Sequence, residues 1–151
     1  MPETIFDKLI RGEIPSWKVW EDERFLAFLT PFPNTPGLTV LIPKKNIGDY
    51  VFALEDEEYM ALMRATRTVA NILEKAFDTP RVALVFEGTG VAHVHAKLIP
   101  LHGELAGRTD VWGPEMVFNS EYRGFLTTAE GPTMSDDELN RIQNIIIDAQ
   151  K

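Results

Sequence analysis

The chain has 151 residues, an ordinary size for one folded domain, and its 44% hydrophobic and 25% charged residues are typical of a globular protein. The absence of cysteine excludes disulfides, thiolate nucleophiles and thiolate metal ligands, and a formal net charge of −8 argues against nonspecific binding to DNA or RNA, although a local pocket could still hold a small phosphate. No signal peptide and no apolar run approaching the ~20 residues that span a bilayer are visible, so we expect a cytoplasmic protein without a membrane partner.

The first half of the chain predicts a short helix, a hairpin, a third strand and a long helix. Helical spacing of apolar residues over 4–11 predicts a helix that ends at Gly12 and Pro15. Two apolar runs at 17–20 and 25–29, separated by a polar turn, predict a hairpin. Prolines and a glycine over 31–37 predict an ordered loop that leads to a strand at 38–42, stopped by Pro43. Apolar residues interleaved with charges predict the main helix at 56–77.

The second half predicts more strands and a final helix. Strands are expected at 81–86, 93–101 and 122–127, with a loop-rich stretch after Gly103. The last helix is expected to begin at Ser135, where Ser-Asp-Asp-Glu has the sequence of a capping box completed by Glu138. Hairpin strands with one long helix packed across them predict an α+β fold on a mostly antiparallel sheet, in a single domain over residues 1–151.

Two of the three histidines lie two residues apart, at His93 and His95. In an extended strand residues at this spacing share a face, so His93, His95 and Lys97 are expected to point one way while the residues between them point into the core. Paired imidazoles could act as a nucleophile or base, or bind a metal, but two histidines followed by a lysine make a poor zinc site. Satisfied histidines on a solvated strand face are the alternative at this point.

The segment at 93–100, His-Val-His-Ala-Lys-Leu-Ile-Pro, resembles the signature of the histidine-triad (HIT) family, in which histidines alternate with apolar residues. Upstream segments resemble the same family in the same order, and the resemblance covers roughly residues 4–101. These segments are the opening stretch at 4–16, the hairpin at 21–28 and the strand with its two lysines at 36–45. The resemblance implies a HIT-like fold with a five-stranded, mostly antiparallel sheet, one long helix, a short N-terminal helix and a C-terminal helix, with 103–151 as an extension packed on it.

The family hydrolyses or transfers nucleotides at the α-phosphate, through attack of the middle signature histidine on phosphorus. By resemblance this nucleophile is His95, and a phosphohistidine forms on it. The backbone carbonyl of the first signature histidine, here His93, would fix the tautomer of the nucleophile. The family does not generally require a divalent ion, so we expect no cofactor and no metal site. A nucleotide or other phosphate-containing small molecule and a second copy of the chain are the expected partners.

The sequence departs from the family at several pocket positions. The third histidine is Lys97, which could neutralise a phosphate, although lysine donates a proton less readily than imidazolium near neutrality. An acidic residue that contacts ribose in many members is Thr30, and two further family histidines are Leu38 and Asn46. The turn before the signature is shorter than in the family. Its residues either contact the ligand or only close a hairpin. The expected ligand contacts are Thr30, Phe32, Asn34, Glu87, Gly88, Thr89 and Gly90.

Three functions remain open: a phosphate-transferring hydrolase, a nucleotide- or phosphate-binding module that has lost turnover, and a structural or dimerisation protein. Changes at Thr30, Leu38 and Lys97 favour the second function. His102 is expected to pack at the surface, away from His95. Trp112 could cover the pocket or pack in the core, and Arg123 could reach an anion or remain a surface charge. The sequence leaves the physiological substrate, the leaving group and the base preference open.

Overall fold

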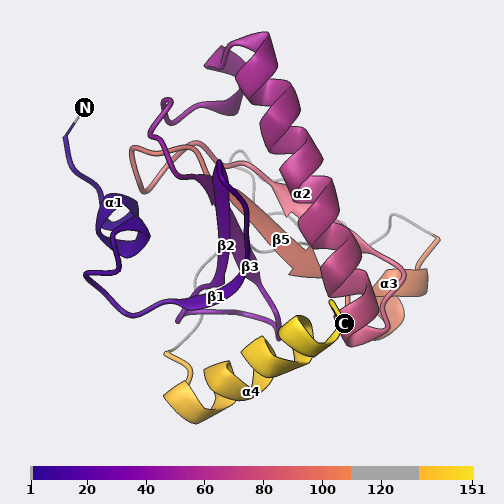
Figure 1. Cartoon of the computed structure of the whole chain (residues 1–151). Helices are drawn as coiled ribbons and strands as arrows, with labels where there is room; N and C mark the ends of the chain where they lie inside the picture. Colours follow the sequence, from indigo (N-terminus) through magenta and orange to yellow (C-terminus); the bar gives the residue numbers. More distant parts are fainter. Residues whose placement is uncertain (1, 110–132) are drawn as a thin grey trace, which may run out of the picture.

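The computed structural model describes residues 2–109 and 133–151, and these form a five-stranded antiparallel sheet between two layers of helix and loop (Figure 1). The strand order is β1-β2-β3-β5-β4, and every neighbouring pair is antiparallel. The strands are β1 (Trp17–Glu21), β2 (Phe25–Leu29), β3 (Thr39–Pro43), β4 (Val82–Val85) and β5 (Ala96–Pro100). The helices are α1 (Ile5–Ile10), the 3-10 turn η1 (Val51–Ala53), α2 (Asp56–Phe77), α3 (Glu104–Gly107) and α4 (Asp136–Asp148). The predicted α+β class and five-stranded sheet are confirmed.

Helices α2 and α4 cover one face of the sheet. Alternate residues of β2 and β5, among them Ala27 and Leu98, point into this layer and are almost fully buried there. They meet the apolar stripe of α2 and one side of α4, which contributes Leu139, Ile142 and Ile146. In Figure 1 the long α2 crosses the sheet and α4 lies beneath its end. Burial of α4 in the same core as the sheet makes the C-terminal helix an integral part of the domain.

Helix α1 lies on the opposite face of the sheet (Figure 1). The other set of strand residues, including Leu26, Val40 and Ile99, forms a second apolar cluster there with Phe6 of α1. The helix begins at a complete capping box, in which Thr4 and Asp7 each accept a hydrogen bond from the other's backbone N–H. Because α1 is short and covers only part of the sheet, it forms one wall of a pocket described below.

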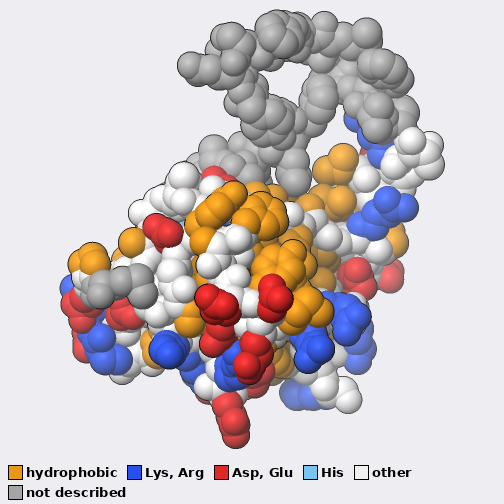
Figure 2. All heavy atoms as spheres, turned by 90° about the horizontal axis from the view of Figure 1, so that it is seen from above, with side chains coloured by type: hydrophobic (Ala, Val, Ile, Leu, Met, Phe, Trp, Pro, Cys, Tyr) orange, Lys and Arg blue, Asp and Glu red, His pale blue; other side chains and the backbone are white. Residues whose placement is uncertain are grey.

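Two exposed aromatic side chains lie at the end of the molecule where α2 begins. Tyr50 and Phe52 stand edge to face with ring centroids 5.6 Å apart, and both are more than half exposed. Figure 2, which views this end, shows hydrophobic side chains gathered beside acidic ones. In the two described ranges no helix is long and apolar enough to cross a bilayer.

Several predicted boundaries were wrong. Pro43 belongs to β3, where it pairs with Phe25 as the last strand residue instead of stopping the strand. Strand β5 begins at Ala96, so His93 and His95 lie in the irregular segment before it and not within the strand. Only half of the predicted capping box at Ser135 is present, because Ser135 accepts from the backbone of Glu138 while the Glu138 carboxylate pairs with Arg141. The predicted strand at 122–127, Trp112 and Arg123 lie outside the described residues.

Candidate functional site

A pocket of about 460 Å³ lies between α1 and the sheet. Most of its wall is apolar, with α1 contributing Ile5, Phe6 and Leu9, and the strands contributing Phe28, Leu38 and Val40. Polar side chains belong to three sets, which are His95 with Lys97, Glu87 with Thr89, and Ser16 with Thr30. A mostly apolar cavity with few convergent polar groups is the usual form of a small-molecule site.

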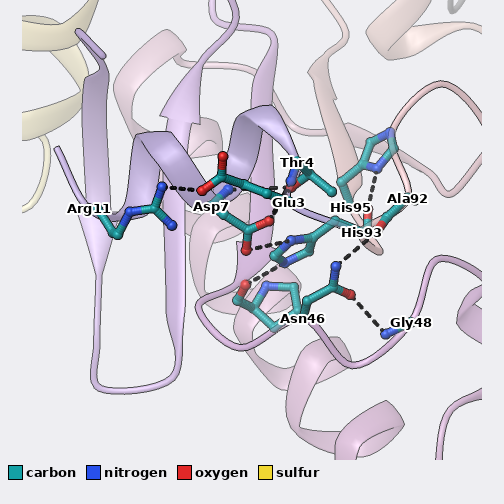
Figure 3. A network of polar contacts seen from close by, with 10 residues as sticks. Glu3, Thr4, Asp7, Arg11, Asn46, Gly48, Ala92, His93 and His95 are labelled. Atoms are coloured by element: carbon teal, nitrogen blue, oxygen red, sulfur yellow. Dashed lines mark hydrogen bonds and ion pairs between the residues drawn. The ribbon is translucent and has the colours of Figure 1, made fainter. Parts of the chain in front are cut away.

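The His95 ring is held in one orientation at the polar side of this pocket. Its Nδ1–H donates to the backbone oxygen of His93 over 2.8 Å (Figure 3). Phe6 packs edge to face against the ring, with centroids 5.3 Å apart. A carbonyl oxygen can only accept, so the proton of the neutral ring must lie on Nδ1. The lone pair of that ring is therefore on Nε2, and the side chain lines the pocket while remaining only 7% exposed.

His93 is completely buried beneath His95. Its Nε2–H donates to the Pro43 oxygen over 2.7 Å, and its Nδ1 has no hydrogen-bond partner among the described residues. The nearest charge is the Asp7 carboxylate, whose Oδ1 is 4.0 Å from that nitrogen. Burial lowers the pKa of the His93 imidazole below its ordinary value and outweighs the opposing effects of the Pro43 hydrogen bond and Asp7. The hydrogen bond of the neutral His93 ring to Pro43 thus holds His93 in place, and with it the backbone carbonyl that orients His95.

The loop that contains Asn46 and Gly48 holds the histidine segment on one side, and Asp7 of α1 lies on the other. The Asn46 amide donates to the Ala92 oxygen over 2.9 Å, and the Gly48 oxygen accepts from the backbone of Val94 over 2.6 Å (Figure 3 shows the Asn46 contact). On the other side, hydrogen bonds from the backbone and hydroxyl of Thr4 lower the pKa of Asp7, which keeps this carboxylate charged at the start of α1. Asn46 thus has a structural role in the site that the sequence comparison with family histidines did not suggest.

Stability should fall on acidification because His93 is held neutral. Below about pH 6.5 the unfolded chain protonates this imidazole while the folded chain resists, so the unfolded state binds more protons and the free energy of unfolding decreases. Between pH 8 and pH 5.5, the free energy of unfolding should fall by about 1 kcal/mol more in the wild type than in His93→Gln. Urea denaturation at both pH values measures it. His102→Gln serves as the control, and its free energy of unfolding should fall as much as that of the wild type. An equally large fall in His93→Gln would contradict the role of His93 in this pH dependence.

Lys97 occupies the third signature position and is paired with a carboxylate. Its ammonium forms an ion pair with Glu87, and the two side chains are only 18% and 28% exposed. The pair follows from strand register, because Lys97 of β5 lies opposite Val85 of β4 and Glu87 comes two residues later. His95, the Lys97 ammonium and the Glu87 carboxylate all line one pocket, whereas His93, which was predicted to share their face, is buried and does not line it.

The structure brings most of the predicted ligand contacts to this pocket. Thr30, Phe32, Glu87, Thr89 and Gly90 line it together with His95 and Lys97. Asn34 and Gly88 are not among the described lining residues. Gly88 has φ +69° and packs so closely on Tyr50 that a Cβ there would lie 3.3 Å from the ring. His102 lies away from the pocket, where it contacts the Pro36 oxygen at 2.8 Å and the Phe77 ring.

Sequence reasoning did not anticipate the apolar wall. The pocket is lined by Ile5 and Leu9 of α1, Ile14 and Val91, none of which was predicted to bind a ligand. The amphipathic spacing of α1 predicted a buried side, and Ile5 remains exposed despite it. An exposed Ile5 that lines the same pocket as Gly90 indicates an apolar surface that a ligand could cover. This arrangement is visible only after folding.

Comparison with known proteins gives the family. The sequence model of the HIT domain matches residues 11–104. The chain belongs to the HIT family. Protein hit of Bacillus subtilis is 35% identical over 113 residues, which cover 72% of this chain and 77% of that protein. The crystal structure of a Hit-like protein from Bartonella henselae superimposes with a TM-score of 0.71 at 26% identity, covering 97% of this chain and 96% of that one.

Another HIT relative is named for a metal. The 14 kDa zinc-binding protein of Zea mays is 35% identical over 117 residues, covering 74% of this chain and 87% of that protein. The described residues at this site do not fit zinc. The sequence has no cysteine, and the described residues contain no group of three or more histidine, aspartate or glutamate side chains placed to hold a metal ion. Asp7 and His93 approach each other only as a pair, so we assign no metal to this site.

Proposed function

We propose that this HIT protein hydrolyses or transfers a nucleoside phosphoramidate, a dinucleoside polyphosphate or a related phosphate compound through a phosphohistidine on His95. The observation that carries the proposal is the hydrogen bond from His95 Nδ1 to the His93 oxygen, because it leaves the lone pair of Nε2 on a ring that lines the pocket. The family resemblance of the signature supports the same role for His95. The apolar wall suits a nucleobase, and Lys97 suits a phosphate.

The reaction divides into two displacements. Nε2 of His95 attacks phosphorus, the bond to the leaving group breaks, and the departing atom takes a proton from solvent or from the Lys97 ammonium. Water then attacks the phosphohistidine, and its proton goes to solvent or, where Lys97 gave up a proton in the first step, back to the Lys97 amine. The phosphorus–nitrogen bond breaks, and the nucleotide and free imidazole are released. Lys97 offsets the negative charge on phosphate, while the His93 carbonyl oxygen, as hydrogen-bond acceptor, stabilises the positive charge that develops on the imidazole.

Hydrolysis of a small substrate panel tests the proposal. Adenosine and guanosine phosphoramidates, a dinucleoside polyphosphate and a nucleotide sugar would be incubated with the protein, and the nucleotide product followed by chromatography. Release of nucleoside monophosphate from at least one member is the expected result. No release from any member would exclude the nucleotide hydrolase for these substrate classes.

A binding module without turnover is the second candidate. It is favoured by the Lys97–Glu87 ion pair, which stands where the family carries a third histidine that can pass a proton. A binding module should melt at a higher temperature with AMP, GMP or phosphate, since a ligand that binds the native state stabilises it, yet release no product. A structural protein would show neither the shift nor the product.

The proposal includes a homodimer in the cytoplasm. Strand β4 ends the sheet, Leu84 on it is exposed, and a groove between α2 and β4 is lined by apolar side chains including Met60, Met63 and Ala70. An edge strand without a further partner strand in the described part of the chain, beside apolar side chains, suits a second copy of the chain. Light scattering should give about twice the chain mass of 17.1 kDa, and a single-chain mass would contradict the dimer.

A further inference from the structure

The pocket contains one carboxylate and one ammonium among the described residues that line it. These are Glu87 and Lys97, and they are paired with each other. The remaining lining residues are apolar, small, hydroxyl-bearing or histidine. The formal charges of these two described side chains therefore cancel before any ligand enters.

A phosphate that binds Lys97 must weaken the ion pair between Lys97 and Glu87. Its oxygens would compete with the Glu87 carboxylate for the same ammonium, and both side chains are largely covered by protein. A partly buried carboxylate that loses its cation is destabilised, and it also repels the arriving phosphate. A ligand that brings only negative charge, such as a polyphosphate chain, therefore meets a disadvantage at this position.

A ligand that brings a cation next to its phosphate avoids the disadvantage. The phosphate then pairs with Lys97, and the ligand's own cation pairs with Glu87, so the carboxylate keeps a cationic partner. Glu87 is well placed for this exchange because it follows β4 at the pocket rim, in the same turn as Thr89 and Gly90, which also line the pocket. The carboxylate can thus turn toward a leaving group without movement of β5.

We propose that Glu87 determines specificity by selecting phosphate compounds whose leaving group carries a positively charged amine, against those whose leaving group is anionic. The inference rests on the proposed function, since it names the substrate class of the same pocket. Aminoalkyl phosphoramidates and aminoalkyl phosphoesters of a nucleoside belong to the selected class. Dinucleoside polyphosphates belong to the disfavoured class.

Two adenosine phosphoramidates of nearly equal size test the selection. One is made from 1,3-diaminopropane, which leaves a free ammonium, and the other from butylamine, which has a methyl group at that place. The wild type should show a kcat/KM about tenfold higher for the cationic compound, as expected for a hydrogen bond between charged groups. Glu87→Gln keeps the size of the side chain but removes its charge, so the ratio should fall to about one.

Glu57→Gln is the control, because Glu57 is an exposed glutamate on α2 with a weak surface ion pair to Arg24 at 3.9 Å. It changes net charge by the same amount and should keep the wild-type ratio. A ratio near one in the wild type, or a tenfold ratio that survives in Glu87→Gln, would overturn the proposal.

A binding measurement separates this inference from the proposed function. AMP carries the phosphate without a cationic group, so removing the competing carboxylate should tighten its binding to Glu87→Gln several-fold in calorimetry, with no change in Glu57→Gln. This result needs no turnover, and with an inactive protein it would support the role of Glu87 while the hydrolase proposal failed. Active protein with equal AMP affinity in wild type and Glu87→Gln would instead overturn the role of Glu87 alone.

Discussion

His95→Ala is expected to lower the rate of nucleoside phosphoramidate hydrolysis by about 1,000-fold or more. Removing the nucleophile of a covalent catalyst leaves only the contribution of binding and electrostatics, and losses of this size or larger are usual. The fold should be retained, because His95 packs at the pocket wall and, among the described residues, its ring hydrogen bond is to the His93 oxygen. Steady-state rates of product release on the preferred panel substrate measure the effect.

His102→Ala controls for the loss of an imidazole elsewhere. His102 contacts the Pro36 oxygen and the Phe77 ring outside the pocket, so its removal should change the rate by no more than about twofold. Acid-labile phosphohistidine provides an independent measure, since a rapidly quenched wild-type reaction should carry the nucleotidyl mass on His95. Full activity in a folded His95→Ala would place the nucleophile elsewhere and remove the mechanism proposed here.

Ile142→Ala is expected to reduce the free energy of unfolding by about 3 kcal/mol. The side chain is 2% exposed and packs in the core that α2, α4 and the sheet share, so truncation removes buried methyl groups and leaves a cavity. Urea denaturation followed by circular dichroism measures the change. The loss should occur in a single transition, because α4 and the sheet belong to one apolar cluster.

Ile147→Ala provides the comparison on the same helix. Ile147 is 38% exposed and lies outside the buried core, so its truncation should cost less than about 1 kcal/mol. Equal small effects at both positions would mean that α4 does not stabilise the domain. A separate early transition in Ile142→Ala would mean that α4 unfolds on its own.

The structure confirms the elements whose signals are local. Helix α2 has its predicted bounds, because its apolar stripe and acidic first turn are both encoded within 22 residues. Strand β2 also has its predicted bounds, since a short apolar run between turn residues reads as a buried strand. The start of β5 was missed because His93–His95 continues the alternation of the strand while its backbone is held by Asn46 and Gly48 instead of a neighbouring strand.

The sequence by itself determined the family and the α+β class, because these follow from patterns that neighbouring residues carry. Only the tertiary structure decided that Glu87 faces Lys97, that Asp7 approaches His93, and that α1 walls the pocket. Each of these contacts joins elements that are separated in the chain and depends on strand register or helix docking. A sequence pattern fixes which face a side chain occupies, but the partner on the facing element follows only from the packed fold.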